Sequence, residues 1–278
     1  MTAVMLRRAA EADAEVLRVD DAHAASLRLA ARTRLLWLAE RGGVAAGHGA
    51  ALPEGRVGLL HVAPAARRQG IGRALLRRVE ADLAALGHAE ARTDASREAR
   101  AFLIACGWEP AQGGSLRKPL PAVRRLAPHE ADLWRRIRLN ALASAPAAFA
   151  EAHDDWAARP LGDFAERLAS SAVFVAELGG AAVGCAELTP DTTGAAGRGW
   201  LESVFVARLA RGRGVADALL VAVENAARAL GLSELCLDVG AANASARGAY
   251  VRAGYAEMAE RPDGSEQACE ITMRRALG

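Results

Sequence analysis

Hydrophobic residues recur at helical spacing in two long segments of the chain. The first segment carries them at Ile71, Leu75, Val79, Leu83 and Leu86, and the second at Val215, Leu219, Val223, Ala227 and Leu230. Steps of three and four residues place side chains on one face of a helix. Gly87 and Gly231 follow the two segments, where a left-handed residue commonly ends a helix. The pattern predicts two amphipathic helices.

Short apolar runs around these helices predict strands. In the first half they are 4–9, 33–40, 44–52 and 57–63, and in the second half 123–127, 172–188, 200–207 and 234–239. Glycine pairs at Gly42–Gly43 and Gly179–Gly180 predict hairpin turns. The segment 88–94, HAEARTD, has poor β-propensity. Each half is predicted to run strand, helices, three strands, loop, helix, strand, helix, strand, which is typical of an α/β fold with a central sheet.

The chain repeats itself. Segment 57–87 matches segment 201–231 at a constant offset of 144 residues, from Arg67 to Arg211 and from Gly70 to Gly214. A repeat this long indicates a duplicated domain. Two prolines within Lys118–Pro121 interrupt regular structure because they lack N–H groups. We expect an N-terminal domain over 1–118 and a C-terminal domain over 122–278.

Composition excludes several classes of protein. With 35 basic and 33 acidic residues the net charge is +2, which gives no field for nucleic acid or anionic lipid. The N-terminal residues lack the apolar stretch of a signal peptide, and no run approaches the length of a membrane span. The four scattered cysteines lack metal-ligand spacing and are expected to be reduced, buried thiols. We expect a cytoplasmic protein without a metal, nucleic-acid partner or membrane partner.

Two glycine loops join a predicted strand to a predicted helix. Glycine lets backbone N–H groups approach a ligand, and the helix N-terminus adds about half a positive charge, which together suit phosphate. A dinucleotide fingerprint needs a third glycine after Gly72, and a Walker loop needs a lysine, but Lys118 is the only lysine. Two tight turns without a ligand remain the alternative. The loops comprise Arg67, Arg68, Gln69, Gly70, Ile71 and Gly72, and Arg211, Gly212, Arg213, Gly214, Val215 and Ala216.

The spacing V-x-x-x-x-R-x-x-G-x-G/A, from Val62 to Gly72 and from Val206 to Ala216, resembles the coenzyme-A loop of the GNAT superfamily of N-acetyltransferases. The segment Asn243–Met258 is similar to the same superfamily's Asn…Ala-x-x-x-Tyr-x-x-x-Gly-Tyr segment. The resemblance covers nearly the whole chain. It implies acetyl-CoA as co-substrate and two consecutive α/β domains, each with a mixed, mostly antiparallel sheet flanked by helices. It also implies that the fourth and fifth strands separate to admit the cofactor.

The resemblance also assigns roles to particular residues. Tyr250 matches the family's acid, which protonates the leaving thiolate, and packing against the sheet is its alternative role. Glu202 stands where relatives carry a base, although contact with a cationic substrate or plain exposure on a strand is open. Cofactor contacts are implied for Val204, Phe205, Val206, Arg211, Gly212, Arg213, Gly214, Val215, Ala216 and Asn243, and in the first half for Leu60, Val62, Arg67, Arg68, Gln69, Gly70, Ile71 and Gly72.

The first half departs from the family pattern at the chemical positions. Leu103 stands at the position of Tyr250, Gly58 at that of Glu202 and Ser96 at that of Asn243. We therefore expect catalysis in the C-terminal domain. The N-terminal domain would be a degenerate partner, empty or holding coenzyme A, in a monomer with an internal pseudo-dimer or in a homodimer.

The expected function is acetyl transfer from acetyl-CoA to a primary amine of a small molecule or peptide. Two alternatives remain: a non-catalytic acyl-CoA-binding or regulatory protein, and an acetyltransferase similar to mycothiol synthase, which has a similar tandem layout. The segment His153–Trp156 offers either an acidic, aromatic pocket for a cationic acceptor or a solvated helix end.

Overall fold

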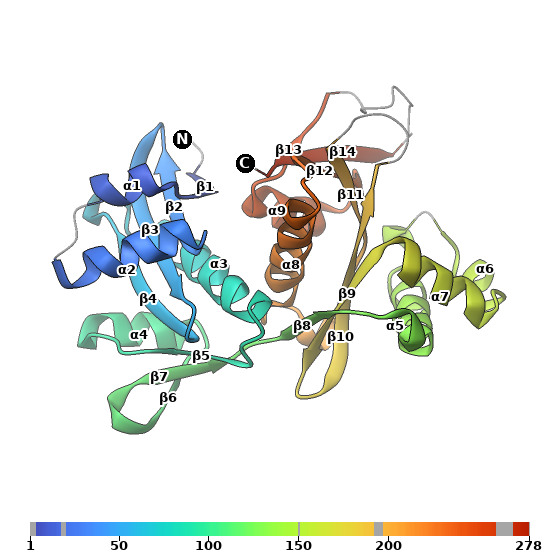
Figure 1. Ribbon diagram of the computed structural model, residues 1–278, viewed down its shortest axis with the longest axis horizontal. Coiled ribbons are helices and arrows are strands. Elements are labelled where there is room, and N and C mark those ends of the chain that lie inside the picture. The colour runs from blue at the N-terminus through green and yellow to red at the C-terminus, as the bar shows by residue number, and fades with distance from the viewer. Residues whose placement is uncertain (1–3, 18–20, 150, 192–196, 260–268, 278) are drawn as a thin grey trace. The chain divides into compact units, whose positions relative to one another are not determined.

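The computed structural model describes residues 4–17, 21–149, 151–191, 197–259 and 269–277. The chain divides into two compact units, Met1–Ala122 and Val123–Gly278. Each unit is built on its own sheet of seven strands (Figure 1). Within the described ranges, no helix is both long enough and apolar enough to cross a bilayer.

The N-terminal unit has the strand order β1-β2-β3-β4-β5-β7-β6. Its β4 and β5 pair in parallel and its other neighbours are antiparallel. Helices α1 and α2 lie on one side of the sheet and α3 on the other (Figure 1). The strands are β1 (Val4–Arg8), β2 (Leu36–Arg41), β3 (Val44–Leu52), β4 (Arg56–Val62), β5 (Glu90–Thr93), β6 (Glu109–Pro110) and β7 (Leu116–Pro119); the helices are α1 (Glu11–Val16), α2 (Asp21–Arg32), α3 (Ile71–Ala85) and α4 (Arg97–Ala105).

The C-terminal unit has the order β13-β14-β12-β11-β10-β9-β8; its β11–β12 pair is parallel, and β9–β10, β10–β11, β12–β14 and β13–β14 are antiparallel. Helices α8 and α9 cover one face of the sheet and α5 to α7 the other (Figure 1). The strands are β8 (Ala122–Arg125), β9 (Ala172–Leu178), β10 (Ala181–Pro190), β11 (Arg198–Val206), β12 (Glu234–Gly240), β13 (Ala256–Glu257) and β14 (Glu270–Ala276); the helices are α5 (Ala131–Ser144), α6 (His153–Ala157), α7 (Leu161–Ser170), α8 (Val215–Ala229) and α9 (Ala244–Ala253).

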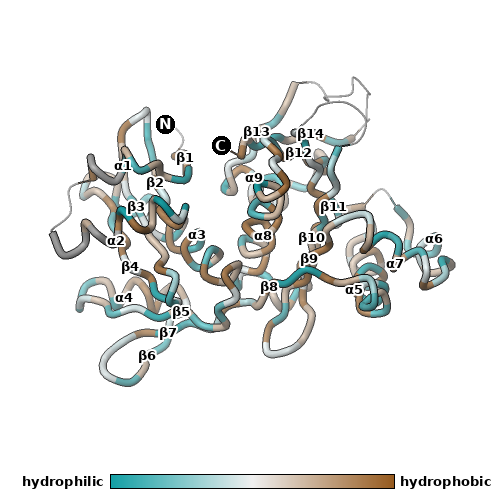
Figure 2. Tube along the Cα trace, in the orientation of Figure 1, coloured by the Kyte–Doolittle hydropathy of each residue, from teal (hydrophilic) through white to brown (hydrophobic). Residues whose placement is uncertain are grey.

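Each face of the C-terminal sheet has its own apolar core. Under α8 and α9 the core includes Leu219, Val223 and Tyr250, while the core under α5 to α7 includes Trp134 and Phe205. Most residues of helix α8 are hydrophobic, as its colour in Figure 2 shows, and the helix lies against the sheet along its length. The predicted fold class and element order are confirmed in both units.

The strand predicted within 88–94 is confirmed as β5 in spite of its poor β-propensity, because antiparallel pairing with β7 supplies its backbone hydrogen bonds. Two other local predictions need correction. The last predicted strand of each unit is a pair of strands, β6–β7 and β13–β14. Of the four thiols predicted to be buried, Cys185 and Cys236 are buried, Cys106 is half-buried and Cys269 is exposed. Cys269 lies in a turn just before β14, outside both cores.

Candidate active site

The two parallel strands at the centre of the C-terminal sheet separate along their length. Strands β11 and β12 are in register only from Arg198 to Trp200 and from Glu234 to Cys236, although β11 continues to Val206. Strand β12 instead pairs with β14 over its whole length. Beyond Trp200, the β12 side of β11 is therefore without a strand partner in the described part of the sheet.

A β-bulge interrupts β11 on its other side as well. Phe205 pairs with Cys185 and Glu202 with Glu187, so two residues of β11, Ser203 and Val204, face one residue of β10. Ser203 takes a left-handed conformation with φ 53°. A bulge leaves the extra residue unpaired and redirects the backbone. The main chain at Ser203 and Val204 is thus out of register with both neighbouring strands, at the point where the sheet opens.

The glycine loop of this unit leads from β11 to the start of α8. Arg211 donates from Nε to the carbonyl oxygen of Val206 at 3.2 Å, which closes the loop. Gly214 precedes α8 with φ 81°, and a Cβ added at Gly212 or Gly214 would meet no described atom within 4 Å. The surface over these glycines is open, and the first N–H groups of a 15-residue helix point toward it. This arrangement fits the phosphate groups of coenzyme A.

Tyr250 lies on the α8–α9 face of the sheet. It is buried, and burial raises the pKa of its phenol above the ordinary value. Its ring packs edge-to-face on Tyr255 with the centroids 5.9 Å apart, and Val204 packs against the same core. A phenol is protonated at neutral pH and can serve as a proton donor, although burial makes this one a weaker acid.

Glu202 lies on the opposite face, in a network of charged side chains. It accepts hydrogen bonds from Arg167 of α7 at 2.8 Å and from Thr189 at 3.0 Å. Arg167 also pairs with Glu187, a carboxylate only 1% exposed. Partial burial raises the pKa of Glu202, the charge of Glu187 raises it further, and Arg167 opposes both effects. A carboxylate with a raised pKa is a better proton acceptor.

Sequence reasoning missed the residues that hold Glu202. Glu187 accepts hydrogen bonds from Ser171 at 2.6 Å and from Ser203 at 2.9 Å, and so ties the bulge to β10. Arg167 joins the two glutamates from α7. The signal in the sequence is Glu187 itself, a charged residue inside the apolar strand AAVGCAELTP.

Two further predicted positions have plain structural roles. The side chain of Asn243 accepts from the N–H of Ala246 at 3.1 Å and caps α9. At the end of the helical arm, Asp154 and Asp155 are exposed while Trp156 is buried. The geometry favours the solvated helix end for the two aspartates and places the aromatic ring in the core.

The N-terminal unit repeats the backbone of this arrangement. Strands β4 and β5 share one register pair, Arg56 with Arg92, and β4 bulges at Gly58. Arg67 donates from Nε to the carbonyl oxygen of Val62 at 3.1 Å, which is the counterpart of the Arg211 contact. Gly70 precedes α3 with φ 81°.

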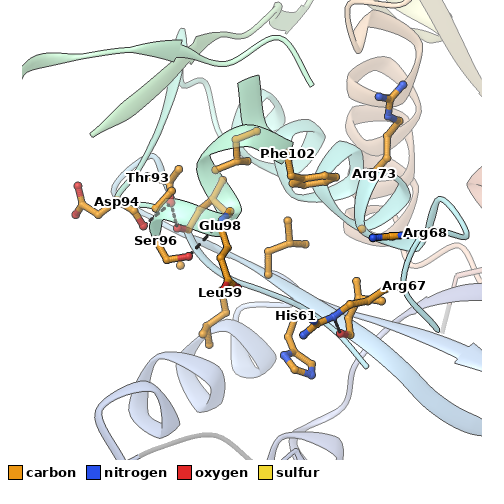
Figure 3. Close-up of a pocket in the computed structure, with 18 of the residues that line it drawn as sticks. Leu59, His61, Arg67, Arg68, Arg73, Thr93, Asp94, Ser96, Glu98 and Phe102 are labelled. Atoms are coloured by element: carbon orange, nitrogen blue, oxygen red, sulfur yellow. Dashed lines mark hydrogen bonds between the residues drawn. The ribbon is translucent and has the colours of Figure 1, made fainter. Parts of the chain in front are cut away.

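A cavity of about 620 Å³ opens between the loop, β4 and α4 of this unit. Figure 3 shows Arg67 and Arg68 on one side of the cavity and Asp94 and Ser96 on the other, with Phe102 between them. The volume lies within the range of about 300–1,000 Å³ typical of small-molecule sites. Of the predicted residues, the lining includes Leu60, Val62, Arg67, Arg68, Gly70 and Gly72.

Two predicted loop residues are not part of that lining. Gln69 accepts a hydrogen bond from Arg41 at 2.7 Å, and Ile71 is buried under the first turn of α3. Their contacts hold the loop in shape. In the lining, Leu103 and Gly58 stand where the C-terminal unit has Tyr250 and Glu202.

The N-terminal unit also carries a pair of histidines. His48 and His61 face each other across β3 and β4, with ring centroids 5.3 Å apart. Burial, and then His61, lowers the pKa of His48 to about 4, so this ring is neutral at physiological pH. His61 is exposed and lines the cavity. At the equivalent positions of its own sheet, the C-terminal unit has Cys185 on β10 paired with Phe205 on β11.

Comparison with known proteins places both units in one family. A profile described as the acetyltransferase (GNAT) family matches residues 135–255, and one described as an acetyltransferase (GNAT) domain matches residues 7–118. A curated relative, the IAA acetyltransferase of Azospirillum brasilense, is 39% identical over 84 residues, which are 30% of this chain and 54% of the relative. The match thus spans about half of that relative's length.

Solved structures similar to this chain include two acetyltransferases. The GNAT-family acetyltransferase of Streptococcus pneumoniae is 19% identical with a TM-score of 0.48, and the match covers 57% of this chain and 99% of that one. The PaiA N-acetyltransferase of Thermoplasma acidophilum, solved with coenzyme A, is 13% identical with a TM-score of 0.46, and the match covers 56% and 98%.

Proposed function

Because the chain belongs to the GNAT acetyltransferase family, with one GNAT domain in each unit, we propose that its C-terminal unit transfers an acetyl group from acetyl-CoA to a primary amine of a small molecule or peptide. The observation that carries this proposal is the bulge at Ser203–Val204. It frees main-chain groups where β11 and β12 have parted, with Tyr250 in the core of one face and Glu202 bonded to α7 on the other.

The loop and the strand edge of this unit would hold the co-substrate. The N–H groups of 211–216 would bind the pyrophosphate, and the exposed Arg211 and Arg213 add positive charge. Main-chain groups of Val204 and Val206 would pair with the pantetheine arm. Acetyl-CoA supplies a thioester, whose carbonyl carbon is open to direct attack by an amine.

The chain's own residues would then divide the proton transfers. Glu202, held by Arg167 and Thr189, accepts a proton from the amine, since only a neutral amine is a nucleophile. The N–H of Val204 stabilises negative charge on the carbonyl oxygen. Tyr250 donates its proton to the departing thiolate, because a buried phenol remains protonated until that charge appears.

For the N-terminal unit we propose cofactor binding without catalysis. The cavity, the open glycine at position 70 and the Arg67 contact supply the binding features, whereas Leu103 and Gly58 supply no proton donor or acceptor. The second candidate for the whole chain is an acyl-CoA-binding protein without transferase activity, for which the N-terminal unit would be the example within the chain.

Calorimetric titration of the full chain with acetyl-CoA, together with a free-thiol assay on a panel of primary amines, tests these proposals. We expect amine-dependent thiol release and a stoichiometry of two, one cofactor in each unit. A stoichiometry of one with activity would leave the N-terminal unit as a scaffold. Binding without thiol release from any amine would support the binding protein, and no binding would overturn both candidates.

A further inference from the structure

A buried arginine lies on the α5–α7 side of the C-terminal sheet. Arg138 of α5 is 1% exposed, and its guanidinium lies over the rings of Trp156 and Phe149, with its carbon 4.8 and 5.0 Å from the two ring centroids. Charged side chains are seldom buried to this degree unless their hydrogen bonds are satisfied. The role of Arg138 should therefore be visible in its hydrogen bonds.

Those hydrogen bonds are incomplete. Nη2 of Arg138 pairs with Glu151, a carboxylate that is 49% exposed. Among the residues that the structure describes, Nε and Nη1 of Arg138 have no acceptor, and neither does the indole N–H of the adjacent Trp156. Three buried donors in one place, two of them on a cation, would be satisfied by an acceptor from outside the chain, and an anion suits the two on the cation best.

The unpaired donors share an apolar core with the strands that form the bulge. Trp156, whose ring lies against Arg138, belongs to the same core cluster as Cys185 of β10. The Sγ of Cys185 donates to the carbonyl oxygen of Ser203, a residue of the bulge, at 3.2 Å. Arg138 therefore lies on the same face of the sheet as Glu202, in the core that borders the bulge.

The charges around the bulge are of both signs. Glu187 and Glu202 lie on β10 and β11, Glu151 follows α5, and two arginines, Arg138 and Arg167, are set among them. Arg138 pairs with Glu151, whereas Arg167 pairs with both Glu187 and Glu202. A face of the sheet that carries charges of both signs suits a molecule that itself carries both charges.

We propose that Arg138 binds a carboxylate of the acceptor, so that the acceptor is an amine of the amino-acid type. Its ammonium group approaches Glu202, where the proton is removed, and its carboxylate takes the free guanidinium N–H groups of Arg138. This proposal rests on the proposed function and adds the chemical class of the acceptor to it. Arg138 is then a specificity residue, since it distinguishes an amino acid from the corresponding simple amine.

The test compares matched acceptors that differ only in the carboxylate. Leucine, phenylalanine and lysine are each assayed beside the amine formed by their decarboxylation, with thiol release as the readout. Charge-assisted hydrogen bonds to a carboxylate favour its carrier by about 10- to 100-fold in kcat/KM. We expect the wild-type chain to show this preference for at least one amino acid, mainly through KM.

Arg138→Met keeps the volume of the side chain and removes its donors. Because Glu151 is half exposed, the substitution leaves no buried carboxylate without a partner. We expect the preference, measured as the ratio of kcat/KM for the amino acid to kcat/KM for the matching amine, to fall to about onefold. The control is Arg136→Met on the same helix, where the arginine is exposed and pairs with Asp132, and there the preference should be unchanged.

A second measurement separates this proposal from the proposed function. The same amino acids and amines are titrated without acetyl-CoA while tryptophan fluorescence is followed, since Trp156 lies against Arg138. Saturation by an amino acid in wild type and its loss in Arg138→Met support the proposal even if no thiol is released. Equal behaviour of amino acid and amine, or saturation by neither, overturns it and leaves a buried water as the partner of Arg138.

Discussion

The two units of this chain have the same backbone devices and different side chains. Both have parallel strands that part after one to three register pairs, a bulge beside the opening, and a loop closed by an arginine on a strand carbonyl. The C-terminal unit adds Tyr250 and Glu202 to this frame. The N-terminal unit has Leu103 and Gly58 instead, together with a cavity of about 620 Å³.

Under the proposed function, this difference separates the groups that bind the cofactor from the groups that transfer protons. Main-chain geometry of the loop depends on glycine and on one arginine contact, and both units keep it. Proton transfer depends on single side chains, which can be lost without disturbing the sheet. A side chain can also change while its structural role is kept: Ser96 stands at the position of Asn243 and caps α4 through the N–H of Ala99, just as Asn243 caps α9.

The largest effect is expected from placing a charge in one glycine loop at a time, which tests whether the two units differ in function. Gly214→Asp should reduce acetyl transfer to background, because a carboxylate would lie where phosphate is expected to bind. Gly70→Asp should remove one binding site and leave transfer intact. Thiol release and calorimetric stoichiometry, measured on both variants, check the two expectations.

The matched controls are Gly214→Asn and Gly70→Asn. Asparagine and aspartate have the same size and both tolerate the left-handed conformation at φ 81°, so the two pairs differ in charge alone. If Gly214→Asn lost as much activity as Gly214→Asp, backbone strain would explain the loss. If Gly70→Asp abolished transfer, the division of labour between the units would be wrong.

A smaller effect is expected from removing the phenol of the C-terminal unit. Tyr250→Phe keeps the ring in its core and takes away the proton donor, so turnover should fall by about 100-fold, the scale of general acid catalysis. Affinity for acetyl-CoA, measured by calorimetry, should be unchanged. Tyr255→Phe is the matched control, since its ring packs on Tyr250 at 5.9 Å. Equal losses in the two variants would point to packing.

Much of this comparison was predictable from the sequence. The repeat, the glycine hairpins and the helix faces follow from spacing along one chain, and they predict the two sheets and both loops. The network of Glu187, Arg167 and Ser203 was not predictable, since its members lie 16 to 20 residues apart and meet only after β10 pairs with β11. Arg138 was also missed, because its position in the pattern of α5 is that of an ordinary helical arginine and its burial becomes visible only in the fold.

The finest test concerns the charge environment that Glu202 has and Gly58 lacks. As a base, Glu202 must be deprotonated, so activity should decline as pH falls through its pKa. Burial and the charge of Glu187 both raise that pKa. Glu187→Gln removes one of these causes and retains hydrogen-bonding groups for Ser171 and Ser203, so the acid limb of kcat/KM should move to lower pH. We expect a shift of about one pH unit or less, the usual scale of a single charge near a partly solvated carboxylate. Glu177→Gln, a remote carboxylate paired with Arg124, is the control and should leave the limb in place. If the acid limb of kcat/KM stayed at the same pH in Glu187→Gln, the proton acceptor would be another group. The same would follow if the limb lay outside the pH range in which carboxylates titrate.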